Sequence, residues 1–125
     1  MNKINFDELN LGHKLNQLSN EQLNELQFGV IGFDNDGIVK VYNAYESNMT
    51  GLSYQNVIDA DLFSIVAPCM NNFLVAQKFE DAVEEKTELD EVMDFVLTLK
   101  MKPTRVKLRI VSAPQLSYNY VIILR

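Results

Sequence analysis

The stretch Phe28–Tyr42, FGVIGFDNDGIVKVY, decides how this chain of 125 residues folds. Its first part, Phe28–Phe33, consists of apolar residues and glycine and has the composition of a β-strand. The polar run Asp34–Gly37 predicts a tight turn, and Ile38–Tyr42 predicts a second strand antiparallel to the first. The chain therefore contains a hairpin against which the remaining elements can be arranged.

One long helix and three more strands are expected after this hairpin. The helix is predicted over Asn72–Lys86, where apolar residues recur every three or four positions. Two strands, Leu89–Leu99 and Thr104–Ser112, alternate apolar and polar residues, whereas Tyr118–Leu124 is nearly all apolar, as in a central strand. Short helices are expected between Asn43 and Ile58, because turn and capping residues interrupt this segment.

Residues 1–27 are polar and too few to fold alone, and they are expected to cover the sheet as a cap. Within them, Ser19 and Gln22 fit a capping box, which predicts a short helix beginning near Asn20. The order of elements predicts an α+β fold, with a five-stranded antiparallel sheet, helices on one face and the cap on the other. This is the architecture of a PAS domain, here a single domain with its core over residues 28–125.

The overall composition argues against several classes of binding partner. A net charge of −6 and a pI of about 4.7 do not suit a phosphate-binding surface. The single cysteine cannot form an internal disulfide. With His13 as the single histidine, the sequence does not favour a metal site. Neither a secretory segment nor an apolar run of membrane length is visible. We expect a cytoplasmic monomer or weak dimer that binds neither nucleic acid nor membrane.

Residues that could carry chemistry gather in two short stretches. Cys69 follows Pro68 in a stiff apolar loop, and taken alone it would be read as a small buried hydrophobe. The other stretch begins at Tyr42 and supplies a phenol, the carboxyl group of Glu46 and the hydroxyl group of Thr50. A thiolate is a good acyl acceptor, so one accessible cysteine is enough to form a thioester.

Short pieces spread along the whole chain match one known family, and the cap matches it least. They are Leu26–Gly29, Asp36–Gly37, Tyr42–Ala44, Glu46, Thr50–Gly51, Val57–Ile58, Val66–Cys69 and Met101–Thr104. With these pieces the sequence resembles the photoactive yellow proteins. The most specific part is the spacing of Tyr42, Glu46 and Cys69, which a PAS domain would rarely keep by chance.

The resemblance implies a blue-light photoreceptor rather than an enzyme, with p-coumaric acid (4-hydroxycinnamic acid) bound as a thioester to Cys69. It implies that Tyr42 and Glu46 hold the buried phenolate of this pigment. Thr50 would support Tyr42, and Met101 would speed the return to the dark state. Light would isomerise the pigment from trans to cis, Glu46 would give up its proton, and partial unfolding would be the signal. Burial beside an anion favours the neutral carboxylic acid that this proton transfer requires.

The expected pocket departs from the family in its lining. Leu52 stands where the family usually has an arginine that gates the pocket, and Leu62 stands where it has phenylalanine. Phe95, Leu97 and Leu99 stand where the family commonly has tyrosine, phenylalanine and tyrosine. The full set of expected pigment-binding residues is Cys69, Tyr42, Glu46, Thr50, Leu52, Leu62, Val66, Ala67, Pro68, Phe95, Leu97 and Met101.

Two other functions stay open at this point. A PAS domain without pigment, serving as an interaction or dimerisation module, would have the same strands and cap. A thiol enzyme with Cys69 as its nucleophile is also conceivable, but it lacks a plausible base because His13 lies in the cap. A photoreceptor would also need a downstream signalling partner, which the sequence does not identify.

Overall fold

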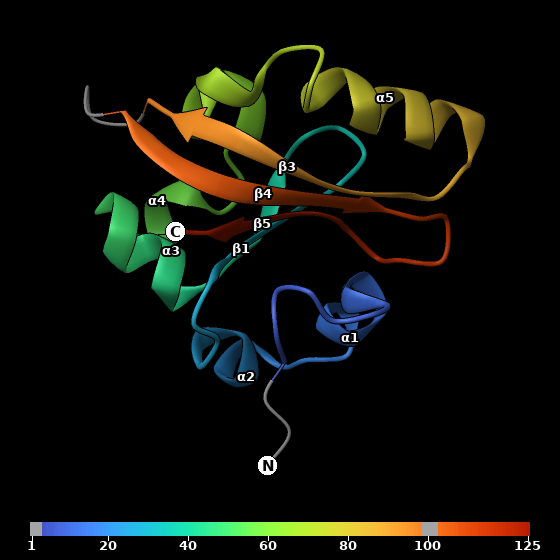
Figure 1. The fold of residues 1–125 in the computed structure, drawn as a ribbon. Coiled ribbons are helices and arrows are strands. Elements are labelled where there is room, and N and C mark those ends of the chain that lie inside the picture. Colours follow the sequence, from blue (N-terminus) through green and yellow to red (C-terminus); the bar gives the residue numbers. More distant parts are fainter. Residues whose placement is uncertain (1–3, 99–102) are drawn as a thin grey trace.

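The computed structural model describes residues 4–98 and 103–125, and its centre is a five-stranded antiparallel sheet (Figure 1). The strands are β1 (Gly29–Phe33), β2 (Val39–Tyr42), β3 (Leu89–Leu97), β4 (Thr104–Ser112) and β5 (Asn119–Leu124). Their order across the sheet is β2-β1-β5-β4-β3, so the most apolar strand, β5, lies in the middle. The predicted α+β fold is confirmed.

Helices and single helical turns cover both faces of this sheet. They are α1 (Leu11–Asn16), α2 (Asn20–Asn24), α3 (Ala44–Thr50), α4 (Tyr54–Val57), η1 (Leu62–Val66), η2 (Pro68–Met70) and α5 (Ala76–Glu85). Figure 1 shows α1 and α2 on one side of the sheet and α5 on the other. The capping box that was predicted for α2 is present, with Ser19 and Gln22 each bonding the backbone of the other.

The sheet separates two apolar cores, because successive side chains of a strand point to opposite faces. On β1, Val30 packs into the core under the cap, together with Leu11 and Leu15. The next residue, Ile31, packs into the other core with Phe79 of α5. All of these side chains are buried, so each face of the sheet is closed by helices.

The long helix begins later than the sequence pattern predicts. The carboxamide oxygen of Asn72 accepts hydrogen bonds from the backbone N–H groups of Leu74 and Val75, at 3.0 and 3.1 Å. These bonds hold a turn, and α5 starts only at Ala76. An asparagine side chain competes with helical backbone bonds in this way. The helix ends close to the prediction, at Glu85, with Lys86 in left-handed geometry as its C-cap.

Arg109 fastens the cap to the sheet. Its Nη1 atom donates to the backbone carbonyls of Phe6 and Glu8, at 2.7 and 2.8 Å. Its Nε and Nη2 atoms donate to the two carboxylate oxygens of Asp90, both at 2.8 Å. One buried side chain of β4 therefore links β3 to the amino-terminal segment.

Candidate functional site

Most of the predicted pigment-binding residues meet in the core on the α5 side of the sheet. Its buried members include Tyr42, Leu62, Val66, Ala67 and Leu97, and its partly buried members include Leu52, Cys69 and Phe95. Glu46 and Thr50 are buried as well, both on α3. Pro68 is exposed, and Met101 and Leu99 lie outside the described residues.

A rigid loop presents the cysteine. The backbone N–H groups of Val66 and Ala67 reach back five residues to the carbonyls of Asp61 and Leu62, at 3.1 and 2.7 Å. Pro68 then begins the short turn η2, which carries the partly buried thiol of Cys69. The N–H of Cys69 has no hydrogen-bond partner within residues 4–98 and 103–125. A free N–H beside a thiol suits the binding of an acyl carbonyl oxygen.

Tyr42 and Thr50 form a buried hydrogen bond at the end of β2. The Tyr42 hydroxyl lies 2.6 Å from Oγ1 of Thr50. The Thr50 hydroxyl donates its own proton to the carbonyl of Glu46 at 3.0 Å, so Tyr42 is the donor in the first bond. Burial raises the pKa of Tyr42 to about 12, although the bond to Thr50 acts in the opposite direction. Tyr42 is therefore a neutral O–H donor at physiological pH.

Asn43 orients the helix that carries Glu46, a role that was not predicted from the sequence. Its Oδ1 atom accepts from the N–H groups of Glu46 and Val30, at 3.2 and 3.0 Å. Its Nδ2 atom donates to the carbonyls of Leu23 and Phe28, at 3.0 and 2.9 Å. This fully buried amide thus joins the cap, β1 and α3. An asparagine immediately before a helix is a sequence signal that could have identified it as the N-cap.

The carboxylate of Glu46 forms an ion pair with Arg125, which follows β5. Nη1 of Arg125 lies 2.7 Å from Oε1 of Glu46, and Nη2 lies 3.0 Å from Oε2. Burial disfavours the charge of Arg125, but the bonds to Glu46 outweigh it and raise the pKa of the guanidinium group. The ring of Tyr45 lies 6.0 Å from the guanidinium carbon, within the range of a cation–π contact. A role for Arg125 was not predicted from the sequence.

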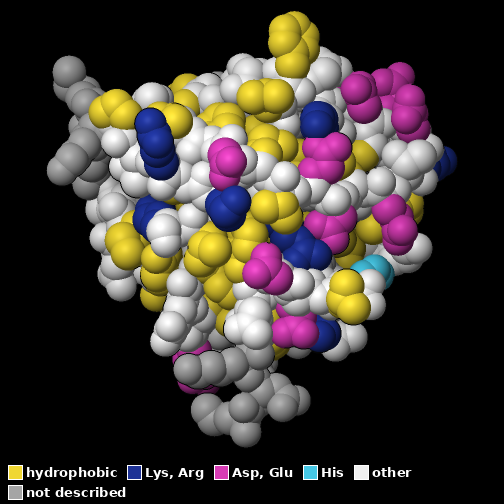
Figure 2. All heavy atoms as spheres, viewed as in Figure 1, with side chains coloured by type: hydrophobic (Ala, Val, Ile, Leu, Met, Phe, Trp, Pro, Cys, Tyr) yellow, Lys and Arg dark blue, Asp and Glu magenta, His cyan; other side chains and the backbone are white. Residues whose placement is uncertain are grey.

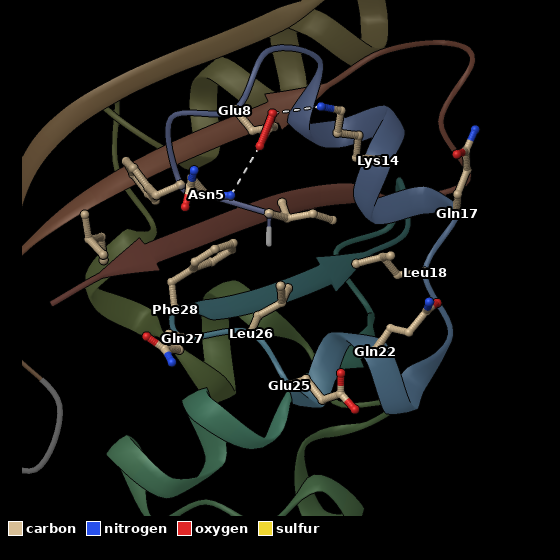
Figure 3. Close-up of a pocket in the computed structure, with 13 residues that line it drawn as sticks. Asn5, Glu8, Lys14, Gln17, Leu18, Gln22, Glu25, Leu26, Gln27 and Phe28 are labelled. Atoms are coloured by element: carbon tan, nitrogen blue, oxygen red, sulfur yellow. Dashed lines mark hydrogen bonds and ion pairs between the residues drawn. The ribbon is translucent and has the colours of Figure 1, made fainter. Parts of the chain in front are cut away.

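Two hollows lie elsewhere, and neither is lined by Cys69. The larger is a groove of about 1380 Å³ between the cap and the sheet (Figure 3). There Glu8 accepts hydrogen bonds from Lys14 and from the backbone of Asn5, at 2.8 and 3.4 Å. The smaller hollow, of about 220 Å³, lies beside Tyr42 and Tyr54.

Acidic groups gather beside α5 on the face that Figure 2 shows, whereas acidic and basic groups are interspersed over β3 and β4. One such pair is Lys107 with Asp94, at 3.1 Å. Within the part of the chain that the structure describes, no helix has the length and apolar character needed to cross a membrane. In the same part, no cluster of histidine, cysteine and acidic residues could hold a metal ion.

Comparison with known proteins decides the family. No protein-family model matches the sequence. The chain is 34% identical over 113 residues to the photoactive yellow protein of Halochromatium salexigens, and the match covers 90% of each protein. It is 31% identical over 107 residues to that of Rhodothalassium salexigens, covering 86% of this chain and 85% of the relative. The chain belongs to the photoactive yellow protein family.

Solved structures agree with this assignment. The photoactive yellow protein domain of the sensor histidine kinase Ppr from Rhodospirillum centenum superposes with a TM-score of 0.82 at 28% identity, covering 91% of this chain and 99% of that domain. The PAS domain of the quorum-sensing receptor RpfR from Cronobacter turicensis, in complex with C12:0, reaches 0.58 at 14% identity, covering 79% of this chain and 91% of that domain. The second likeness shows the PAS fold alone. The likeness to the Ppr domain, together with the family assignment, supports a PAS-type photoreceptor.

Proposed function

We propose that this protein is a blue-light receptor that carries p-coumaric acid as a thioester on Cys69. The observation that carries the proposal is the meeting of the thiol of Cys69 and the buried phenol of Tyr42 in one apolar core. The family assignment supports it, because the relatives are named as yellow, photoactive proteins. When bound, the pigment would supply absorption of blue light and isomerisation about its double bond.

The residues of the core fit such a group at both of its ends. At the acyl end, the Cys69 sulfur would bond to the carbonyl carbon of an activated acyl donor, whose leaving group departs as the thiol loses its proton. The N–H of Cys69, which no described residue accepts, can then donate to the thioester oxygen. Leu62, Val66 and Leu97 exclude water between the two ends, because all three side chains are buried.

At the phenol end, Tyr42 and Glu46 would bind the pigment oxygen. A buried phenolate without donors is costly, and charge-assisted O–H bonds offset that cost. Tyr42 carries the required proton, which it donates to Thr50 in the structure. To bind the pigment, it would turn this proton from Thr50 to the pigment oxygen and accept the Thr50 proton in its place. Glu46 must carry a proton too, and it must turn away from Arg125 to reach the pigment. After light absorption, Glu46 would give this proton to the phenolate oxygen of the pigment, and the fold would loosen near the site as the signal.

The test is covalent loading of the pigment-free protein with activated p-coumaric acid. We expect the mass of one coumaroyl group and a yellow colour in the wild type, and neither in Cys69→Ala. A matched control places a cysteine at the exposed Ser64 in the Cys69→Ala background. This variant should gain the mass but stay colourless, because a solvated phenol is neutral at physiological pH.

Loading of Cys69→Ala would contradict the thioester assignment. If the wild type does not load, the alternative is a PAS interaction module without pigment. In that case the protein should show a dependence of its oligomeric state on concentration, measured by light scattering.

A further inference from the structure

The carboxyl group of Glu46 is buried at a defined position against the sheet. It is directed at Arg125, and 1% of the residue is exposed to solvent. Oε1 lies over the backbone of Gly29 in β1, where an added Cβ atom would come within 2.0 Å of it. Only glycine leaves room for the carboxylate at this position.

The strand register explains why Arg125 reaches this site. Gly29 pairs with Ile123 across β1 and β5, so the residue two positions beyond Ile123 lies beside the start of β1. The planar guanidinium group then meets both carboxylate oxygens, and Tyr45 of α3 contacts it at 6.0 Å. Elements from three parts of the chain therefore surround one carboxylate.

We propose that Arg125 is the positioning residue that keeps Glu46 ionised and turned toward the sheet whenever no pigment phenolate binds it. This inference rests on the proposed function, since only a pigment would give Glu46 a second partner. The geometry carries it: two parallel N–H···O bonds between an arginine and a carboxylate favour the charged form of the acid. Arginine cannot give up its own proton to neutralise the pair.

The ion pair changes what happens when Glu46 releases a proton. Without a cation nearby, the resulting carboxylate would be a buried charge with poor partners, which is a costly state. Arg125 instead offers it the two hydrogen bonds that the structure shows. The Glu46 side chain thus alternates between two positions, neutral at the pigment and ionised at Arg125. The arginine favours the second position, and it therefore promotes release of the proton.

The test uses the pigment-free protein at neutral pH and infrared spectroscopy of carboxyl groups. Subtracting the spectrum of Glu46→Gln from that of the wild type isolates Glu46. We expect an ionised carboxylate signal in this difference. A second subtraction removes the spectrum of the double variant, Arg125→Gln with Glu46→Gln, from that of Arg125→Gln alone. This difference should instead show a protonated carboxyl band.

Two further variants separate the charge of Arg125 from its shape and from general loss of structure. Arg125→Lys keeps the charge but loses the planar pair of donors, so Glu46 should stay ionised with a shifted carboxylate band. Arg109→Gln removes the other two-point arginine–carboxylate pair and should leave the Glu46 signal unchanged. Circular dichroism confirms that each variant is folded before its spectrum is compared.

A protonated Glu46 in the pigment-free wild type would overturn the inference, and so would an ionised Glu46 in folded Arg125→Gln. If Arg125→Gln does not fold, the wild type and Arg125→Lys decide the question alone. These spectra need no pigment. A protein that shows the Arg125-dependent carboxylate but never loads at Cys69 would therefore overturn the proposed function and not the ion pair.

Discussion

Two arginines each bind a carboxylate through two hydrogen bonds, but the two pairs differ in which partner is buried. In the pair of Arg125 with Glu46, the acid is buried, with 1% of its side chain exposed against 15% for the arginine. In the pair of Arg109 with Asp90, the arginine is buried, with 8% exposed against 45% for the acid. A buried acid depends on its arginine for its charge, whereas a half-exposed acid is also stabilised by water.

The other partners of the two arginines differ as well. Arg109 donates to the backbone carbonyls of Phe6 and Glu8, which cannot titrate. Its role is therefore structural, holding the cap to the sheet. The hydrogen bonds of Arg125 go to a carboxyl group that can be neutralised and rotated. The same two-point contact thus serves as a clamp in one place and, by our proposal, as part of a switch in the other.

The largest effect is expected from Arg125→Gln, which leaves Glu46 buried without its cation. Removing one partner of a buried ion pair typically costs about 3–5 kcal/mol of unfolding free energy. Protonation of Glu46 should limit the loss to the lower end of that range. Adding Glu46→Gln should restore most of the stability, because no buried charge then remains. Urea unfolding of the two single variants and the double variant measures this coupling.

A double variant no more stable than Arg125→Gln would show that Arg125 acts through packing and not through the charge of Glu46. Arg125 would then stabilise the fold without any dependence on the charge of its partner.

Arg109→Gln is expected to cost less, about 1.5–3 kcal/mol, the range for hydrogen bonds that involve a charged group. Adding Asp90→Asn should not restore the loss, because the carbonyls of Phe6 and Glu8 still lack their donor. Hydrogen exchange should become faster in residues 4–27 and stay unchanged in α3. Restored stability in the double variant, or faster exchange in α3, would mean that this pair too is governed by its carboxylate.

Much of the fold could be predicted because it follows from local patterns. Alternating apolar residues identified β3 and β4, and apolar composition identified the other strands. Ser19 with Gln22 identified the start of α2. The start of α5 was predicted too early, because Asn72 resembles an N-cap in sequence but holds a separate turn. That distinction depends on backbone geometry three residues further on, which periodicity does not record.

Only part of the site could be predicted from the sequence, for a similar reason. The spacing of Tyr42, Glu46 and Cys69 pointed to one pocket, and the structure brings Tyr42 and Cys69 into one core. Arg125 was not predicted, because a lone charge at the end of an apolar strand usually lies in solvent. Its partner is 79 positions away in the chain. Gly29 on the neighbouring strand was the available clue, since a glycine inside a strand often marks a close approach.

The smallest effect concerns Tyr42, whose phenol lies near the Glu46 ion pair. The charge of Glu46 raises the pKa of Tyr42, and the charge of Arg125 lowers it. We therefore expect Glu46→Gln to let Tyr42 ionise at a lower pH and Arg125→Gln to have the opposite effect. Tyr120 is a matched control, because burial and the neighbouring Tyr118 raise its pKa to about 12 without any contribution from this pair. Carbon-13 NMR of labelled tyrosine during an alkaline titration separates the two residues.

The raised pKa of Tyr42 also determines how its contribution to stability changes with pH. The pKa of Tyr42 is about 12 in the folded protein, against about 10 in an unfolded chain. Between these values the unfolded chain loses its proton first, so rising pH favours unfolding. Tyr42→Phe should therefore lose less stability than the wild type over this alkaline window. An equal loss in both proteins would place the buried, neutral phenol elsewhere than at Tyr42.

By our proposal, Glu46 is a neutral proton donor at the pigment in the dark and an ionised partner of Arg125 after light absorption. A light-minus-dark infrared difference spectrum of the loaded wild type tests it most directly. We predict that illumination removes a protonated carboxyl band and produces a carboxylate signal, and that Glu46→Gln lacks both. In loaded Arg125→Gln, less of the protonated band should disappear. A band that is absent from the loaded protein in the dark, or that survives in the long-lived lit state, would contradict the account.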